Sequence, residues 1–181
     1  SGSSKGKKLI MPNDKTTRPL KDIAKESIFN IITHAKFINF HLKDSRVLDL
    51  FSGIGSFGLE CISRGSKFVF FLENYPPVLE ILKINISNLN YENKSKVIEI
   101  DAFTINNSIF KDDQKFQIIF CDPPYKEKKI ELLIENIIEM NILEKNGIII
   151  IHRKKGDLDS YPNNFKIIDK KNYGLSTFVF G

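Results

Sequence analysis

The sequence predicts an α/β fold: a doubly wound, mostly parallel β-sheet covered by helices on both faces. Short apolar runs alternate along the chain with segments whose apolar residues recur at helical spacing, and this alternation is typical of parallel sheets. The strand runs are solidly apolar, as burial on both faces requires. Near residues 172–174 a turn separates two further runs, which predicts a C-terminal hairpin with an antiparallel strand at the edge of the sheet.

The apolar runs assign the elements in order. The segment 18–37 (RPLKDIAKESIFNIITHAKF) predicts a helix, because Pro19 can begin a first turn and apolar residues follow at helical spacing. The polar, basic residues 1–18 predict an extended arm, in which the opening SGSS is given no weight, and residues 19–181 predict a single domain. The strands are expected at 46–51, 67–73, 96–100, 116–122 and 147–153, and the helices between them at 56–65, 77–90 and 128–140.

Composition limits the classes of function. The formal net charge of +5 permits a polyanionic partner without requiring one. Cys61 and Cys121 lie far apart and belong to no CxxC or Cys/His cluster, so we expect core positions, no disulfide, no metal site and a reducing cytoplasm. We see no apolar run of about 18 residues and no signal peptide, so a membrane is not an expected partner.

A glycine loop follows the first expected strand. Gly53, Gly55 and Gly58 match the G-x-G-x-x-G pattern of nucleotide-binding loops, and Glu73 ends the second strand, where an acid can bind ribose hydroxyls. Asp49 precedes the loop, and its carboxylate would repel a pyrophosphate but suits a cationic ligand. S-adenosylmethionine carries a sulfonium and an ammonium and no phosphate, so it fits this loop better than NAD. The alternative is a strand–helix turn that needs glycine only for packing.

The third strand ends in a further acid. Asp101 can accept a hydrogen bond from an adenine amine, while Ala102 and Phe103 can line the ring. Asp is also a favoured residue at the start of a helix. Both roles are compatible with the sequence.

A rigid corner ends the fourth strand, where Asp122-Pro123-Pro124-Tyr125 follows the apolar run FQIIF. Prolines cannot donate to a strand ladder, and their fixed φ sets the direction of the neighbouring carbonyl groups. Asp122 and one of these carbonyls can accept the two protons of an exocyclic amine, while Tyr125 can stack on the base, which must leave its helix to enter such a pocket. The corner therefore predicts a clamp for an amine-bearing base beside a methyl donor. The alternative is that the prolines merely end the strand.

These motifs resemble those of S-adenosylmethionine-dependent amino-methyltransferases, and the whole chain resembles the RsmD-type family of small-subunit ribosomal RNA guanine-N2 methyltransferases. The resemblance rests on GKKLIMP, TTRP, KESIFNII, DLFSGIGSFGLECISRG, Glu73, DPPY and YGLSTFVFG. The chain departs from the family pattern at Lys25, Cys61, Asn74 and His152, the last where an acid is often seen. The resemblance implies a Rossmann-like methyltransferase fold, S-adenosylmethionine as donor with S-adenosylhomocysteine as product, and the N2 amine of a guanine in 16S ribosomal RNA as acceptor.

The resemblance also implies residue roles. The base would be held by Asp122, Pro123, Pro124 and Tyr125, and ribosomal RNA would be contacted by Lys7, Lys8, Thr17 and Arg18. The cofactor would be lined by Asp49, Phe51, Ser52, Gly53, Gly55, Glu73, Asn74, Asp101, Ala102 and Asp122. The expected partner is ribosomal RNA within the small subunit or an assembly intermediate, and the protein is expected to act as a monomer. A solvated basic tail is the alternative for the lysines.

Two other functions share these motifs. A DNA adenine-N6 or cytosine-N4 methyltransferase would use the same loop and clamp, but only about seventy residues separate the two motifs, and the fold's own elements fill them. A non-catalytic RNA-binding module would not need Asp49, Glu73 and Asp122. Of the three histidines, His34 and His41 are expected to be structural and His152 to line the pocket.

Overall fold

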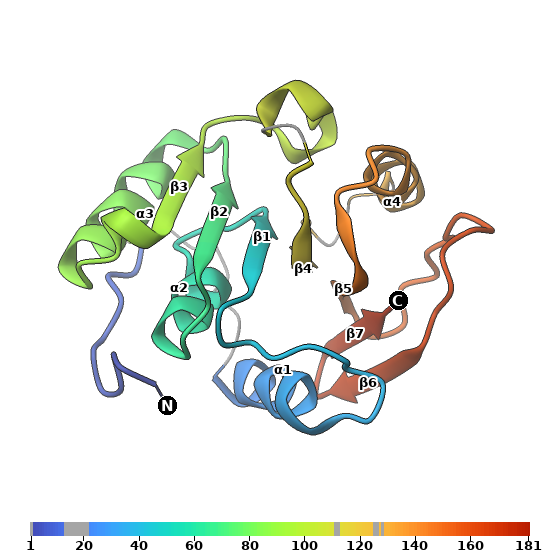
Figure 1. Ribbon diagram of the computed structural model, residues 1–181, viewed down its shortest axis with the longest axis horizontal. Helices are drawn as coiled ribbons and strands as arrows, with labels where there is room; N and C mark the ends of the chain where they lie inside the picture. Colours follow the sequence, from blue (N-terminus) through green and yellow to red (C-terminus); the bar gives the residue numbers. More distant parts are fainter. Residues whose placement is uncertain (1, 13–21, 111–112, 125–126, 128) are drawn as a thin grey trace.

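The described residues form a seven-stranded sheet in the order β3-β2-β1-β4-β5-β7-β6 (Figure 1). The computed structural model describes residues 2–12, 22–110, 113–124, 127 and 129–181. Strands β3, β2, β1, β4 and β5 are parallel, and β7 runs antiparallel to both β5 and β6. The predicted doubly wound, mostly parallel sheet is therefore confirmed.

The elements follow the predicted order, with small differences at their ends. Strand β5 begins four residues before the predicted start at residue 147, next to an irregularity in its pairing with β4. Pro19 lies outside the described residues. The bounds are α1 Asp22–His34, β1 Arg46–Leu50, α2 Ser56–Ser63, β2 Phe68–Leu72, α3 Pro76–Asn88, β3 Ser95–Ile98, β4 Phe116–Cys121, α4 Ile130–Glu139, β5 Leu143–Lys154, β6 Asp169–Tyr173 and β7 Ser176–Phe180, with short 3₁₀ turns at Glu92–Lys94, Ala102–Thr104 and Asn107–Ile109.

The C-terminal hairpin joins the sheet through β7, whereas the sequence predicts the antiparallel strand at the edge. The antiparallel strand β7 does not form the edge, because it pairs with β5 on one side and with β6 on the other. The sequence of each strand explains this order. Strand β7 (STFVF) is apolar and buried, whereas β6 (DKKNY) is polar and largely exposed, as suits an edge strand.

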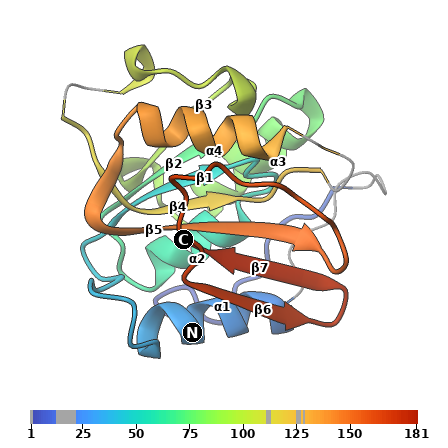
Figure 2. The same ribbon diagram turned by 90° about the vertical axis from the view of Figure 1, so that its right-hand side faces the viewer.

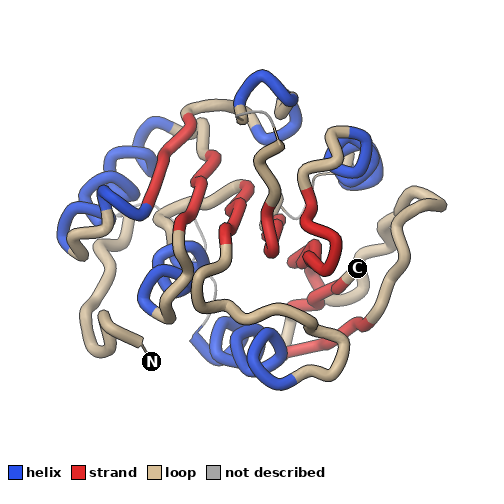
Figure 3. The backbone as a smooth tube through the Cα atoms, in the orientation of Figure 1, coloured by secondary structure: helices blue, strands red, loops and turns tan. Residues whose placement is uncertain are grey.

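Helices cover both faces of the sheet, and each face has its own apolar core. Helices α1, α2 and α3 pack on one face, whereas α4 and the 3₁₀ turns after β3 pack on the other. Figure 2 shows α4 on one side of the strands and α1 and α2 on the opposite side, and Figure 3 shows the same layering in the backbone trace. Within the described ranges, no helix combines the length and the apolar character that crossing a membrane requires.

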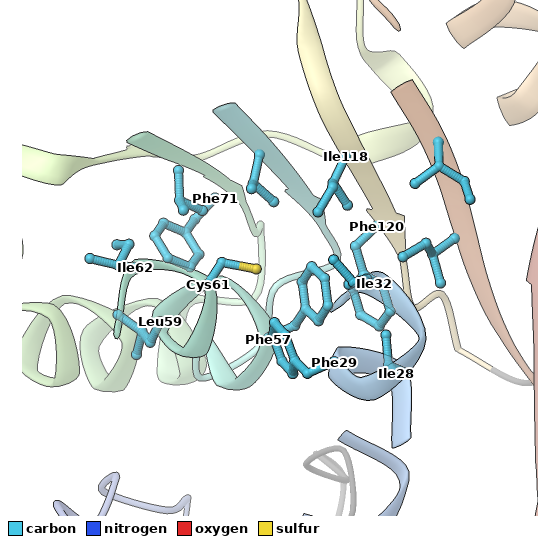
Figure 4. Packing of buried hydrophobic residues seen from close by; sticks show 14 of the residues in the cluster. Ile28, Phe29, Ile32, Phe57, Leu59, Cys61, Ile62, Phe71, Ile118 and Phe120 are labelled. Atoms are coloured by element: carbon cyan, nitrogen blue, oxygen red, sulfur yellow. The ribbon is translucent and has the colours of Figure 1, made fainter. Parts of the chain in front are cut away.

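A stack of aromatic rings joins the helices to the centre of the sheet. The ring of Phe57 in α2 lies between Phe29 of α1, at a centroid distance of 5.3 Å, and Phe120 of β4, at 4.0 Å, with interplanar angles below 20° (Figure 4). Phe57 follows the glycine loop, and Phe120 lies two residues before Asp122. The stack therefore holds the start of α2 against the end of β4, where the two motifs meet.

Gly58 lets α2 approach the sheet closely, and we expect Gly58→Ala to destabilise the protein. A Cβ atom at this position would lie 2.3 Å from Cε1 of Phe71 and 2.8 Å from Cγ1 of Val69, both of which are buried. Such overpacking costs about 1–3 kcal/mol of unfolding free energy, which exceeds or cancels the roughly 1 kcal/mol that alanine gains in helix propensity. Thermal and urea unfolding measure the change, with Ser87→Ala on the exposed side of α3 as the control. A variant as stable as the control would contradict this account of the packing.

Candidate active site

Candidate side chains from neighbouring strands share one face of the sheet. Asp49 of β1 is in register with Phe71 of β2 and with Phe120 of β4. Glu73 follows Phe71 by two residues, and Asp122 follows Phe120 by two. Because alternate residues of a strand face the same side, both acids lie on the same face of the sheet as Asp49, two residues closer to the carboxyl ends of the strands. The ladder continues to them, because the N–H of Glu73 donates to Ile98 and the N–H of Asp122 donates to Leu50. The three acids thus gather where parallel strands end.

Asp49 is a buried acid that caps the helix after the glycine loop. Its side chain is buried, and Oδ2 accepts a hydrogen bond of 2.9 Å from the backbone N–H of Gly58 in the first turn of α2. Burial raises the pKa of the Asp49 carboxyl well above its ordinary value; the bond from Gly58 opposes this, and the nearby charges of Asp122 and Glu73 raise it further. A cationic group at this edge would relieve the repulsion among these acids.

Gly53 and Gly55 of the glycine loop have positive φ angles, in the left-handed region that glycine adopts without strain. Gly55 has φ of +86°, and a Cβ atom there would lie 2.7 Å from Cδ1 of Leu82. The N–H of Gly53 donates to Oε2 of Glu73 at 2.8 Å, and the hydroxyl of Ser52 donates to the carbonyl of Leu72 at 2.8 Å. The loop after β1 is therefore tied to the end of β2.

Glu73 joins two loops through both of its carboxylate oxygens. Oε2 accepts from Gly53, and Oε1 accepts from the backbone N–H groups of Asn74 and Tyr75, each at 2.9 Å. A carboxylate offers about four acceptor positions. Three are used here, so Glu73 keeps capacity to accept from one hydroxyl of a ligand.

The loops after β1 and β3 meet through two aromatic rings. The centroids of Phe51 and Phe103 lie 5.2 Å apart. Oδ1 of Asp101 accepts from the backbone N–H of Phe103 at 3.0 Å, so the predicted helix-capping role of Asp101 is present. Asp101 is exposed and Ala102 is buried beside it. These residues form an apolar wall with an acceptor at its edge.

Arg153 holds the proline corner from β5. Its Nη1 donates to the carbonyl of Pro124 at 3.3 Å, and its Nη2 donates to the carbonyl of Glu127 at 2.9 Å. The guanidinium is buried and forms a bidentate ion pair with Asp159. The carbonyl of Pro124 also accepts from the N–H of Glu127. The carbonyl of Pro123 is therefore the better candidate acceptor for a ligand.

His152 contacts the acid of the corner, and this contact goes beyond the pocket lining that the sequence predicts. Nδ1 of His152 lies 2.7 Å from Oδ1 of Asp122, and Nε2 lies 2.9 Å from Oγ of Ser176. Strand alternation was the available signal, because His152 follows Ile148 and Ile150 at two-residue spacing on the face that carries Asp122.

The predicted RNA-binding and stacking residues are only partly covered by the structure. Lys7 and Lys8 are exposed, as a contact with a polyanion requires. Thr17, Arg18 and Tyr125 lie outside the described residues, and their roles stay predictions.

The N-terminal residues make contacts that the sequence analysis did not expect. The hydroxyl of Ser4, in the opening SGSS, lies 2.6 Å from that of Tyr91. Asn85 of α3 accepts from the N–H of Ile10 at 2.7 Å and donates to its carbonyl at 3.2 Å. The same amide also donates to the carbonyl of Ile54 in the glycine loop. Residues 2–12 are thus held on the side of the domain that carries this loop.

The remaining singled-out residues take no direct part in the site. Cys61 and Cys121 are free and buried in the two cores, as predicted, and burial raises the pKa of both thiols. His34, in the last turn of α1, and His41 are both exposed, and their structural role stays a prediction.

Comparisons with known proteins show which family the chain belongs to. A family model described as "Conserved hypothetical protein 95" matches residues 1–181. A Bacillus subtilis protein named "Putative rRNA methyltransferase YlbH" is 34% identical over 177 residues, which cover 97% of this chain and 93% of that protein. "Ribosomal RNA small subunit methyltransferase D" of Buchnera aphidicola is 31% identical over 172 residues, which cover 94% and 85%. The chain belongs to the RsmD-type methyltransferase family. The resemblance read from its motifs is therefore confirmed.

Solved structures show that the RsmD-type chain has a methyltransferase fold. A structure titled as a putative methyltransferase from Escherichia coli superposes with a TM-score of 0.81 at 23% identity, covering 99% of this chain and 93% of that one. A putative methylase from Haemophilus influenzae gives 0.70 at 28% identity, with coverages of 88% and 95%. A putative methyltransferase complexed with SAH gives 0.66 at 16% identity, with coverages of 86% and 48%.

We expect Asp49→Asn to stabilise the folded protein at neutral pH. Asn keeps an oxygen that can accept from Gly58 and removes the buried charge. Because the folded-state pKa of Asp49 is raised, the native state binds more protons than the unfolded state, so wild-type stability falls as pH rises through that pKa. The melting temperature of Asp49→Asn should exceed that of wild type at neutral pH, by about 2–4 °C for each kcal/mol gained.

The pH dependence checks the cause of this gain. The difference should vanish as the pH falls through the folded-state pKa towards 3.8, the ordinary value for Asp. Thermal unfolding across this range measures it, with Glu135→Gln on the exposed side of α4 as the control. An equal or lower melting temperature for Asp49→Asn at neutral pH would show that the charge is compensated in the fold.

Proposed function

We propose that this protein transfers a methyl group from S-adenosylmethionine to the N2 amine of a guanine in small-subunit ribosomal RNA. The observation that carries the proposal is the row of acids at the carboxyl edge of the sheet, with Asp49 and Glu73 beside Asp122 of the proline corner. Membership of the RsmD-type family supports the reaction class. The relatives named "Ribosomal RNA small subunit methyltransferase D" support the choice of ribosomal RNA.

The charges, the hydrogen-bond acceptors and the apolar wall of the site suit S-adenosylmethionine. Asp49, Glu73 and Asp122 repel one another, so a ligand with a sulfonium and an ammonium would stabilise this edge, whereas a pyrophosphate would not. Glu73 has acceptor capacity for a ribose hydroxyl, and the wall of Phe51 and Phe103 suits an adenine ring. When bound, the cofactor supplies an electrophilic methyl group. The residues proposed to line it are Asp49, Phe51, Ser52, Gly53, Gly55, Glu73, Asn74, Asp101, Ala102 and Asp122.

The proline corner is proposed to orient the base. The lone pair of an exocyclic amine is delocalised into its ring, so the amine must be held by its protons with the lone pair directed at the methyl group. Asp122 accepts one N–H and the carbonyl of Pro123 accepts the other, while Arg153 keeps the carbonyl of Pro124 engaged. Tyr125 is proposed to stack on the base, a contact worth roughly 1–3 kcal/mol. Positioning then supplies most of the rate.

The acceptor and its context rest on the family. The clamp would serve adenine N6 or cytosine N4 equally well, so guanine N2 follows from the resemblance to RsmD-type enzymes. Lys7, Lys8, Thr17 and Arg18 are proposed to contact the RNA, in a chain whose net charge is +5. The substrate is the small subunit or an assembly intermediate, and the enzyme acts as a cytoplasmic monomer.

A methyl-transfer assay tests this function. Labelled S-adenosylmethionine is offered with undermethylated small ribosomal subunits, with their naked RNA and with unmethylated DNA, and the product nucleosides are analysed. We expect N2-methylguanosine at one site in the subunits. Methyladenine or methylcytosine in DNA would overturn the proposed substrate, and no transfer to any of the three would overturn the proposed reaction.

Substitutions of two acids separate base positioning from cofactor binding. We expect Asp122→Ala to lower kcat by about 10²-fold or more, because the base loses its orientation, while cofactor affinity stays nearly unchanged. We expect Glu73→Gln to weaken cofactor affinity by about tenfold, because a charge-assisted hydrogen bond is lost. Calorimetry and single-turnover kinetics measure the two effects, with Glu80→Gln on the exposed side of α3 as the control. Equal losses of cofactor affinity in both variants would contradict this division of roles.

A further inference from the structure

We propose that His152 is a positioning residue of the base clamp: its Nδ1–H holds Oδ1 of Asp122 and leaves Oδ2 for the amine, while Ser176 holds the opposite edge of the imidazole ring. The inference rests on the proposed function, since it assigns the group that orients Asp122. His152 lies in β5 and belongs neither to the glycine loop nor to the proline corner.

Two hydrogen bonds and one ring stack hold the imidazole of His152. Nδ1 contacts Asp122 at 2.7 Å and Nε2 contacts the hydroxyl of Ser176 at 2.9 Å. The ring lies parallel to that of its cross-strand partner Phe178, with centroids 4.6 Å apart and an interplanar angle of 16°. Only 7% of the side chain is exposed, against 24% for Asp122. The histidine is therefore the buried member of the pair, and the acid is the member that a ligand can reach.

The partners of the ring determine which nitrogen carries the proton. An ionised carboxylate can only accept, so the nitrogen that faces Asp122 must donate. In a neutral imidazole Nε2 then has a lone pair, and the hydroxyl of Ser176 can donate to it. One consistent chain of donors runs from Ser176 through His152 to Asp122. Ser176 fits this tautomer and fixes the orientation of the ring, whereas Asp122 determines which nitrogen carries the proton.

The corner is held from both faces of the sheet by consecutive residues of β5. His152 faces the core of α1–α3 and binds the acid, whereas Arg153 faces the other side and binds the carbonyl of Pro124. The backbone N–H of Asp122 also donates to the carbonyl of Leu50. Separate contacts thus position Asp122 and the carbonyl of Pro124. A site that binds an amine in one orientation needs its acceptors held in this way.

A purely structural histidine would behave differently from a positioning residue. If His152 only packs against Phe178, then His152→Phe should preserve function, because a phenyl ring can stack in its place. His152→Asn should then be the damaging change, since it loses the stack and leaves a small polar group in the core. If His152 positions Asp122, the order reverses, because the Asn amide can place an N–H close to the position of Nδ1.

We expect His152→Phe to lower kcat by about 10–100-fold with cofactor affinity unchanged, because a misplacement of about 1 Å in a positioning group can cost about 10²-fold. His152→Asn should recover most of this loss, and Ser176→Ala should fall between the two. Single-turnover methyl transfer, cofactor calorimetry and thermal unfolding are measured for each variant, with His41→Asn at an exposed site as the control. Activity retained by His152→Phe and lost by His152→Asn would overturn the inference while the proposed function stands.

A second measurement does not depend on activity. In protein labelled with ¹⁵N-histidine, the ring nitrogens of His152 are assigned by their absence in His152→Asn, and the exposed His34 and His41 serve as references. We expect a protonated Nδ1 both in wild type and in Ser176→Ala, because Asp122 faces this nitrogen in each. An unprotonated Nδ1 in wild type would overturn the inference even if no methyl acceptor is found.

Discussion

The parallel register around β1 is the constraint on which the candidate site depends. Because Asp49 pairs with Phe71 on one side and with Phe120 on the other, the residues two positions later fall on the same face at the same edge. A slip of one residue in either pairing would turn Glu73 or Asp122 to the opposite face. The solidly apolar strands and the ring stack beneath them oppose such a slip, since it would exchange the two cores. The geometry of the site is thus a consequence of core packing.

The site also contains a feature that core packing does not favour. Asp49 lies among buried apolar residues with two further acids nearby, and its raised pKa records an unfavourable interaction in the folded state. The hydrogen bond from Gly58 and the positive end of α2 offset only part of it. Local conflicts of this kind are expected at functional sites, where binding of a ligand of opposite charge removes the conflict.

The sequence predicted those parts of the site that follow from one strand and the loop after it. Asp49, Glu73 and Asp122 each stand at the end of an apolar run, and topology alone brings such ends to one edge. The contact between His152 and Asp122 was harder to predict, because strand alternation gives only the face of His152 and the contact also needs β4 and β5 to be neighbours. Ser176 joins the site only because the hairpin inserts β7 beside β5, and the sequence analysis had placed the antiparallel strand at the edge.

The chain combines a basic composition with an acidic site, and the two have different consequences for RNA. A net charge of +5, with Lys7 and Lys8 exposed, favours approach of a polyanion. The carboxyl edge with its three acids repels phosphate, whereas a neutral base meets no such repulsion there. In the proposed reaction this opposition of charges selects an unstacked base over the backbone. The carboxylate of Asp122, held by His152, then accepts a hydrogen bond from the amine of that base.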